Sequence, residues 1–324
     1  MRQMTLAGRR IADNEPCYVI AELGHNHGGS VVTARQMIAS AAVCGAHAVK
    51  LQKRDNATLY TPAMLNRPYD HPFSYGPTYG AHRAALEFGE AEYQQCLIES
   101  QLNHVMLFAT AFDEPSADFL VQVGVHAIKI HSGGLTDGPL LRHVASLGLP
   151  IVLSTGGSTE AEIDVAINQL EDCAVAVLHC TAAYPVTNYV EHNLRCIERL
   201  CARYPDRVIG WSGHDSGIAM AVAAYALGAR IIEMHFTLNR AMRGTDHGWS
   251  LEPVGFRKLC RDLTRAHQAM GDGVKRVYQS EYAPIQKMRR TQDVHDQWQI
   301  RMPDERCWDT HSTLLRPLED RRCL

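Results

Sequence analysis

Two histidines close consecutive apolar runs in the second half of the chain. His214 follows the run at residues 207–210, and His235 follows the run at residues 229–232. If both runs are neighbouring strands, two neutral imidazoles at their ends make half of a divalent-metal site, with open positions for a substrate oxygen. A single histidine is more often a hydrogen-bonded structural residue, and the chain contains 17 of them. The pair therefore indicates a metal site but leaves a structural role open.

Eight short apolar runs alternate with amphipathic segments of helical period along most of the chain. The runs lie at residues 17–21, 46–51, 104–109, 126–130, 150–153, 174–178, 208–210 and 230–234. Nearly continuous apolar strands are typical of a parallel sheet that is buried on both faces, and a count of eight favours a closed barrel over an open sheet. No glycine-rich dinucleotide-binding pattern follows the first run, which argues against a Rossmann fold.

Two segments do not fit this repeat. A long insertion at residues 53–89 follows the second predicted strand, where barrel enzymes often carry functional loops. A polar segment follows the last predicted helix. The sequence therefore predicts an α/β protein with a (β/α)8 TIM-barrel domain over residues 1–272, interrupted by the insertion, and a short C-terminal extension over residues 273–324.

Composition excludes several classes of protein. The chain is 46% hydrophobic and 21% charged, which is enough for a large core and incompatible with global disorder. A net charge of −3 argues against a nucleic-acid or anionic-membrane partner. Residues 1–10 lack the apolar segment of a signal peptide, and the most apolar stretch, residues 218–232, is too short to span a bilayer. Ten cysteines without a CxxC pair indicate free thiols in a reducing compartment, so we expect a soluble, cytoplasmic protein.

Polar residues stand at or just after the end of every predicted strand. They are Glu22, Lys50 with Gln52, Thr110, Lys129 with His131 and Ser132, Ser154 with Thr155, His179 with Thr181, Ser212 with His214, and Glu233 with His235. Barrel enzymes build their active sites from the carboxyl ends of the strands. Because the same feature at all eight ends is hard to obtain by chance, it predicts a functional site there.

The residue types in this set narrow the chemistry. Lys50 and Lys129 would place two positive charges in one cup beside several hydroxyl donors, which suits a ligand with more than one anionic group, such as a carboxylate plus a phosphate. Glu22, Glu233 and Asp246 are acceptors suited to a polyhydroxylated partner or to proton transfer. Together with a Lewis acid on the histidine pair, the set suggests condensation of a phosphorylated three-carbon acid with a sugar aldehyde.

These residues resemble the sialic acid synthase family, whose phosphoenolpyruvate-dependent barrels make nine-carbon sugar acids and which includes spore-coat polysaccharide synthases. The resemblance runs from about residue 20 to residue 273. The segments that carry it lie at residues 20–29, 48–52, 128–133, 153–157, 179–185, 210–214, 233–236, 243–247 and 250–253.

The resemblance implies a role for each candidate residue. Phosphoenolpyruvate would contact Lys50, Thr110, Lys129, Ser132, Ser154 and Ser212. The acceptor sugar would contact Glu22, Gln52, Tyr184, Glu233 and Asp246. A divalent ion, expected to be Mn2+ with Mg2+ or Co2+ as alternatives, would be bound by His214 and His235. The implied catalytic residues are Glu22, Lys50, Lys129 and Glu233.

Three departures from the family pattern concern the phosphate, the metal and the acceptor. Ala182 stands where the family usually has an asparagine that contacts phosphate, and Gly213 stands where an aspartate commonly precedes the metal-binding histidine. The extension shows no pattern of the family's C-terminal antifreeze-like domain, which reaches over the site of a partner subunit. We therefore expect the insertion, with Arg54 and Arg83, to complete the acceptor pocket, and we expect a homodimer formed through barrel surfaces.

The predicted function is that of a phosphoenolpyruvate-dependent, carbon–carbon bond-forming transferase. It would condense phosphoenolpyruvate with an aldehyde (amino)sugar to give a 2-keto-3-deoxy sugar acid of the nonulosonic type plus phosphate, as a step of carbohydrate biosynthesis. Two alternatives stay open. Lys50 or Lys129 could form the Schiff base of a class I aldolase, which needs no metal. The loss of the phosphate contact at Ala182 would also fit a non-catalytic relative that binds a sugar acid.

Overall fold

Eight parallel strands close into a barrel, as predicted. The computed structural model describes residues 1–292 and 298–300, and the chain divides into two compact units, Met1–Met270 and Gly271–Leu324. In the first unit the strands run in the ring order β10-β3-β4-β5-β6-β7-β8-β9, and all eight neighbouring pairs are parallel. The strands are β3 (Tyr18–Gly24), β4 (Ala48–Lys53), β5 (Met106–Ala111), β6 (Ile128–Ile130), β7 (Ile151–Ser154), β8 (Val175–Cys180), β9 (Val208–Gly213) and β10 (Ile231–His235).

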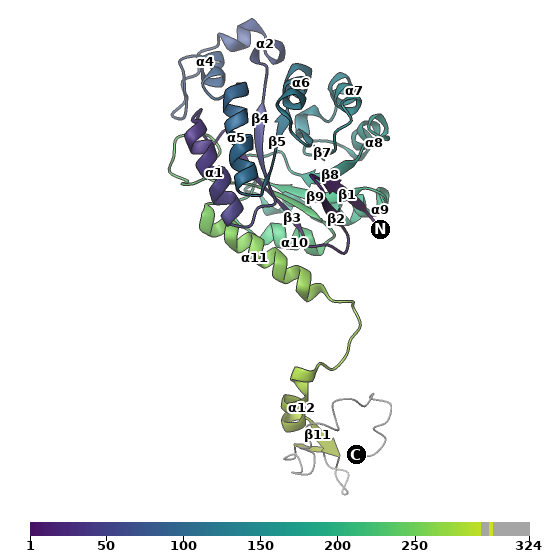
Figure 1. The fold of residues 1–324 in the computed structure, drawn as a ribbon. Coiled ribbons are helices and arrows are strands. Elements are labelled where there is room, and N and C mark those ends of the chain that lie inside the picture. The colour runs from purple at the N-terminus through teal and green to yellow at the C-terminus, as the bar shows by residue number, and fades with distance from the viewer. Residues whose placement is uncertain (293–297, 301–324) are drawn as a thin grey trace. The chain divides into compact units, whose positions relative to one another are not determined.

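Each barrel strand is followed by a helix of eight or more residues, and together these helices surround the ring of strands (Figure 1). Local sequence sets where these helices begin and end. In α6, for example, the Asp113 side chain accepts a hydrogen bond from the Ser116 backbone N–H at 2.8 Å, and Gly124 ends the helix with a φ of 90°. The helices are α1 (Val31–Val43), α5 (Glu90–Leu102), α6 (Glu114–Val123), α7 (Gly138–Ser146), α8 (Glu160–Gln169), α9 (Cys196–Arg203), α10 (Ala219–Ala226) and α11 (Pro253–Met270).

Alternation of side chains along the strands divides the core into two clusters. Outward-facing residues such as Val19 and Ala21 of β3 pack with the helices. Inward-facing residues such as Ile20 of β3 and Phe108 of β5 fill the barrel interior. Because the side-chain period of a strand is two, the next inward residue of β3 after Ile20 is Glu22, so the apolar interior changes to a polar one toward the carboxyl ends.

An N-terminal hairpin closes the opposite end of the barrel and was not predicted from the sequence. Its strands, β1 (Gln3–Leu6) and β2 (Arg9–Ala12), pair antiparallel through a tight turn in which Ala7 and Gly8 both have positive φ. Leu6 and Ile11 are fully buried. They pack against inward-facing residues near the beginnings of the barrel strands, such as Tyr18 of β3. The hairpin therefore acts as an apolar plug.

The strand boundaries differ from prediction in a systematic way. Most strands begin later than predicted and run further; β9, predicted to end at Gly210, continues to Gly213, and β4 continues to Lys53. Polar residues such as Gln52 and Ser212 therefore lie within the ends of the strands, as inward-facing residues, whereas Ser132 and His214 follow the strands. Between β4 and α5 the insertion holds three short helices, α2 (Asn56–Leu59), α3 (Pro62–Leu65) and α4 (Tyr79–Ala84).

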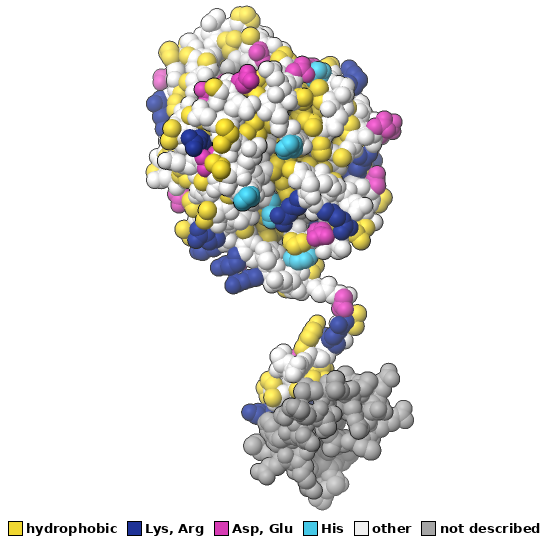
Figure 2. Space-filling model, viewed as in Figure 1, with side chains coloured by type: hydrophobic (Ala, Val, Ile, Leu, Met, Phe, Trp, Pro, Cys, Tyr) yellow, Lys and Arg dark blue, Asp and Glu magenta, His cyan; other side chains and the backbone are white. Residues whose placement is uncertain are grey.

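The second unit contains a short helix, α12 (Tyr282–Met288), and an antiparallel pair, β11 (Arg290–Gln292) with β12 (Trp298–Ile300). The remainder of the predicted extension, residues 293–297 and 301–324, lies outside the described residues. Among the described residues, no helix has both the length and the apolar character needed to cross a membrane. On the face of the first unit that Figure 2 shows, basic side chains are interspersed with acidic ones.

The plug predicts a stability effect that is separate from the site. Replacing Leu6, which is fully buried, with alanine should lower the free energy of unfolding by about 2–5 kcal/mol, because it leaves a cavity under the barrel. Denaturant titration followed by circular dichroism measures this. Val43→Ala, at a position that is 71% exposed on α1, is the control and should change stability by less than about 0.5 kcal/mol. Equal effects of the two substitutions would show that the hairpin does not plug the barrel.

Candidate active site

A cavity of about 320 Å³ opens at the carboxyl ends of the barrel strands. Its walls include every residue that the sequence analysis selected for a role. These are Glu22, Lys50, Gln52, Thr110, Lys129, Ser132, Ser154, Tyr184, Ser212, His214, Glu233, His235 and Asp246. The structure thus brings together residues that are up to 224 positions apart in the chain, although it does not by itself assign their roles.

A buried ammonium between two carboxylates occupies the floor of the cavity. Lys50 Nζ lies 2.7 Å from Glu22 Oε2 and 3.8 Å from Glu233 Oε1, and it donates a hydrogen bond to Thr110 Oγ1 at 2.8 Å. Glu22 of β3 is the register partner of Lys50 of β4, and β10 supplies Glu233 from the other side of β3. All three ionisable side chains are nearly inaccessible to water, so breaking this group would strand a buried charge.

The two carboxylates have different proton affinities. Burial raises the pKa of Glu22, and the nearby Glu233 adds to this, although Lys50 opposes both. Burial also acts to raise the pKa of Glu233, but Lys50 and Lys129 together outweigh it, so this pKa lies below its ordinary value. Carboxylates whose pKa values are driven apart are typical of sites that need one proton-bearing and one ionised group.

Lys129 is the second buried ammonium. It comes from β6 and donates hydrogen bonds to Ser154 Oγ at 2.5 Å and to the Ile130 carbonyl at 2.9 Å. Burial lowers its pKa to about 8, against the opposing charge of Glu233. Two lysines in one cup raise the electrostatic potential and thereby favour an anionic ligand.

The predicted histidine pair is adjacent and partly preorganised. The rings of His214 and His235 lie with their centroids 5.6 Å apart, and Trp249 contacts both. His214 Nδ1 lies 2.9 Å from the Thr181 carbonyl, a contact that suits an Nδ1–H donor and leaves Nε2 as a free acceptor. His235 Nδ1 is buried, lacks a hydrogen-bond partner among the described residues, and lies 3.8 Å from Asp246 Oδ2.

These features fit a two-histidine metal site. Burial, and then the neighbouring His214, hold the pKa of His235 well below its ordinary value, so this imidazole is in the neutral form that binds metals. No group of three or more potential metal-ligating side chains is clustered within the described part of the chain. An ion here would therefore take further ligands from the substrate or from water.

The cavity also contains residues that the candidate list did not include. Of these, Cys180 is the last residue of β8 and lies two positions after the inward-facing Leu178, so period-two counting would have found it. His25 and Thr245, which lie in loops, gave no such signal, because only the closed barrel brings them to the mouth. The additional residues are His25, Phe112, Cys180 and Thr245. Arg54, Arg83 and His131, which the sequence analysis named, also line the cavity. The insertion thus lines the cavity through Arg54 and Arg83, while its role in binding the acceptor stays a prediction.

Packing accounts for one departure from the family pattern. A Cβ atom at Gly213 would overlap the buried ring of Trp211 and approach the Met234 sulfur to 2.6 Å. No side chain fits at this position unless Trp211 moves. Asp215, two residues further on, is buried and carries an oxygen with no hydrogen-bond partner among the described residues.

Comparison with known proteins identifies the family. The model of the NeuB family matches residues 37–275. The chain belongs to the NeuB family. It is 35% identical to N-acetylneuraminate-9-phosphate synthase of Mus musculus over 88% of this chain and 79% of that protein. It is also 34% identical to N,N'-diacetyllegionaminic acid synthase of Campylobacter jejuni over 84% of this chain and 83% of that one.

A solved structure agrees with this assignment. The N-acetylneuraminic acid synthetase of Leptospira borgpetersenii, in complex with citrate, superposes with a TM-score of 0.76 at 32% identity, covering 88% of this chain and 95% of that one. The resemblance to sialic acid synthases is therefore confirmed, and with it a relationship to synthase enzymes of carbohydrate biosynthesis. The relatives are named for different sugar acids, so they do not identify the acceptor of this NeuB-family protein.

The environment of Lys129 predicts an unusual titration. Its side chain should lose a proton with a pKa of about 8, because burial disfavours the ammonium, so the residue should be largely neutral at pH 9. Nuclear magnetic resonance of protein with 13C-labelled lysine follows this directly, and the spectrum of Lys129→Arg identifies the signal. A Lys129 signal that titrates near the ordinary lysine value of about 10.4 would contradict the electrostatic picture of the site.

Proposed function

We propose that this NeuB-family protein condenses phosphoenolpyruvate with an aldehyde amino sugar, releasing phosphate and a 2-keto-3-deoxy sugar acid of the nonulosonic type. The observation that carries the proposal is the pair of buried ammonium groups, Lys50 and Lys129, in one cavity with Glu22 and Glu233. Two cations that line one cavity favour a small ligand with two anionic groups, which describes phosphoenolpyruvate. The carboxylates and Gln52 leave hydroxyl-binding positions for a sugar beside it.

The chain's own residues position the reactants. Lys50 and Lys129 hold the carboxylate of phosphoenolpyruvate, and the hydroxyls of Ser154 and Ser212 face its phosphate. This arrangement fixes the orientation of the enol carbon toward the mouth of the cavity, where the aldehyde enters. Orientation of two reactants in this way removes a large part of the entropic barrier to their reaction.

The reaction balances without a redox step. Carbon 3 of phosphoenolpyruvate forms a bond to the aldehyde carbon, and the aldehyde oxygen takes a proton to become a hydroxyl. Water adds to carbon 2 and loses one proton, which balances the proton gained by the aldehyde oxygen. The resulting tetrahedral centre then expels phosphate, and its hydroxyl proton leaves with the phosphate as the ketone forms. Glu22 and Glu233 flank Lys50 and are the carboxylates placed to accept the proton of the water.

A divalent ion such as Mn2+ would be held by His214 and His235, with Mg2+ or Co2+ as alternatives. When bound, such an ion supplies Lewis-acid chemistry that polarises an aldehyde oxygen. Thr181 positions the ring of His214 for this through its carbonyl, and Trp249 packs against both rings. The homodimer and the cytoplasmic location expected from the sequence stay predictions.

The proposal is tested by mixing the protein with phosphoenolpyruvate, Mn2+ and a panel of amino-sugar aldehydes. Phosphate release should depend on an aldehyde and equal the sugar acid formed. His214→Ala and His235→Ala should each lower metal-dependent turnover by about 100-fold or more, because developing charge on the aldehyde oxygen loses its stabilisation. His143→Ala, which removes a surface histidine paired with Asp118, is the matched control and should keep full activity. Full activity of a metal-stripped protein would refute the role of the ion.

One observation favours a second function, that of a class I aldolase. With its pKa lowered to about 8, Lys129 has enough neutral amine near neutral pH to attack a carbonyl. Such an enzyme would form a covalent imine with its substrate and would not release phosphate from phosphoenolpyruvate. Borohydride added during turnover would then trap an adduct on Lys129, detectable by mass spectrometry, whereas the condensation proposed above leaves the lysine unmodified.

A further inference from the structure

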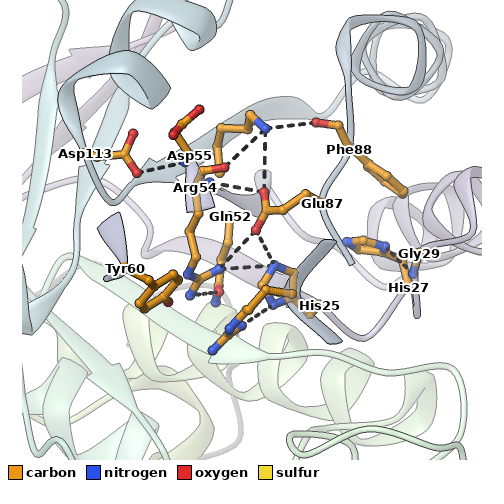
Figure 3. Close-up of polar contacts among 12 residues, drawn as sticks. His25, His27, Gly29, Gln52, Arg54, Asp55, Tyr60, Glu87, Phe88 and Asp113 are labelled. Carbon is orange, nitrogen blue, oxygen red and sulfur yellow. Dashed lines mark hydrogen bonds and ion pairs between the residues drawn. The ribbon is translucent and has the colours of Figure 1, made fainter. Parts of the chain in front are cut away.

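The loop that follows β3 contacts two segments that line the mouth of the cavity. This β3–α1 loop, residues 25–30, meets the insertion on one side, where the ring of His27 stacks on Phe88 with centroids 4.0 Å apart (Figure 3). On the other side, Asn26 contacts the β10–α11 loop, residues 236–252. The β3–α1 loop therefore joins the insertion to the β10–α11 loop.

Asn26 makes this second contact through both N–H groups of its amide. The residue is 2% exposed, and its Nδ2 donates to the Phe236 carbonyl at 2.9 Å and to Ser250 Oγ at 3.0 Å. Ser250 Oγ in turn donates its only proton to the Asp246 carbonyl at 2.6 Å. One side chain thus fixes the beginning and the end of the β10–α11 loop, and through Ser250 it reaches Asp246.

The segment held in this way surrounds the predicted metal-binding histidines. Asp246 lines the cavity, and its Oδ2 lies 3.8 Å from His235 Nδ1. The ring of Trp249 lies with its centroid 4.1 Å from that of His235 and 5.6 Å from that of His214. The Leu251 backbone N–H donates to the His235 carbonyl at 2.8 Å. The position of this segment therefore determines what surrounds both imidazoles.

The β3–α1 loop is itself held closely against the insertion. A Cβ atom at Gly29 would lie 2.1 Å from the Ala85 carbonyl oxygen, and φ at Gly29 is 79°, so no other residue fits without a shift of the backbone. The Gly29 backbone N–H also donates to His27 Nδ1 at 3.1 Å (Figure 3). Asn26 therefore projects from a tightly packed loop, and its hydrogen bonds extend that support to the β10–α11 loop.

Building on the condensation proposed above, we propose that Asn26 is a positioning residue of this site. Acting through Ser250, it holds Asp246 and Trp249 where they orient His235 for a divalent ion and where Asp246 faces the acceptor sugar. Neither Asn26 nor Ser250 is among the described residues that line the active-site cavity, so both act through other side chains. Groups that orient metal-binding residues from behind commonly govern metal affinity.

The contacts expected for phosphoenolpyruvate do not depend on this arrangement. Lys50 of β4 donates to Thr110 of β5, and Lys129 of β6 donates to Ser154 of β7. These four residues come from strands on the other side of β3 from β10. Loss of the Asn26 contacts should therefore affect the ion and the acceptor sugar and spare phosphoenolpyruvate.

The first measurement is a titration of the protein with Mn2+ alone, followed by electron paramagnetic resonance of the free ion. Asn26→Leu keeps nearly the same side-chain size and removes both donors, so it should weaken Mn2+ binding by about 10- to 100-fold. Ser250→Ala is a milder second variant and should change the affinity in the same direction. Ser100→Ala, which removes a buried hydroxyl that donates to the Leu97 carbonyl in α5, is the matched control and should bind Mn2+ like the wild-type protein.

The second measurement is steady-state turnover at saturating Mn2+ with an amino-sugar aldehyde that the wild-type protein uses. In Asn26→Leu and Ser250→Ala the KM of the aldehyde should rise by about 10-fold or more, because the Asp246 carboxylate is displaced. The KM of phosphoenolpyruvate should stay at the wild-type value. A purely structural role would instead reduce the fraction of active protein, which lowers the apparent kcat and leaves both KM values unchanged.

The outcomes separate this inference from the function on which it rests. Wild-type Mn2+ affinity in both folded variants, or a wild-type protein that does not bind Mn2+, would overturn the positioning role, as would equal rises in the two KM values. Absence of phosphate release by the wild-type protein with any aldehyde would overturn the condensation, and the Mn2+ titration would still decide the role of Asn26. Thermal unfolding shows whether each variant is folded; if Asn26→Leu is not, Ser250→Ala decides the question.

Discussion

The alternation of side chains along parallel strands in common register is the constraint on which the rest of this structure depends. In β4, Ala48 fills the barrel interior and Lys50 and Gln52, the next residues of the same face, reach the cavity. In β10, Ile231 is followed in the same way by Glu233 and His235. Because a closed barrel brings all inward faces to one axis, a change from apolar to polar residues in each strand is sufficient to assemble a site.

Such a site is electrostatically expensive. Four ionisable side chains are nearly inaccessible to water: Glu22, Lys50, Lys129 and Glu233. Their mutual attraction offsets only part of the free energy lost with their hydration. The amino-terminal half of the barrel carries no such cost, because the hairpin and residues such as Phe108 fill it with apolar side chains. The amino-terminal ends of the strands thus contribute apolar packing that stabilises the fold. The carboxyl ends carry charged side chains that do not stabilise the fold and are available to a ligand.

Most of the architecture could be predicted from the spacing of hydrophobic residues in the sequence, since all eight predicted apolar runs are barrel strands. Their ends were placed too early because an inward-facing polar residue, such as Ser212 in β9, looks like the start of a loop when neighbours are unknown. The hairpin was missed because its strands are only four residues long, so that each contributes only two buried residues to the hydrophobic pattern. Loop residues such as His25 and Thr245 reach the cavity through tertiary structure alone, which no local pattern encodes.

The two ends of the cavity are built by different parts of the chain. The lysines and histidines come from barrel strands or directly follow them. The insertion supplies Arg83, which lines the cavity, and Glu87, which contacts Arg54. Glu87 accepts a hydrogen bond from the Arg54 backbone N–H at 3.1 Å, and this contact ties the insertion to the end of β4. A change in the insertion therefore alters what the distal end of the cavity binds while the register that sets the lysines and carboxylates stays intact. Separation of this kind allows one barrel to keep its chemistry while the preference for the second substrate changes.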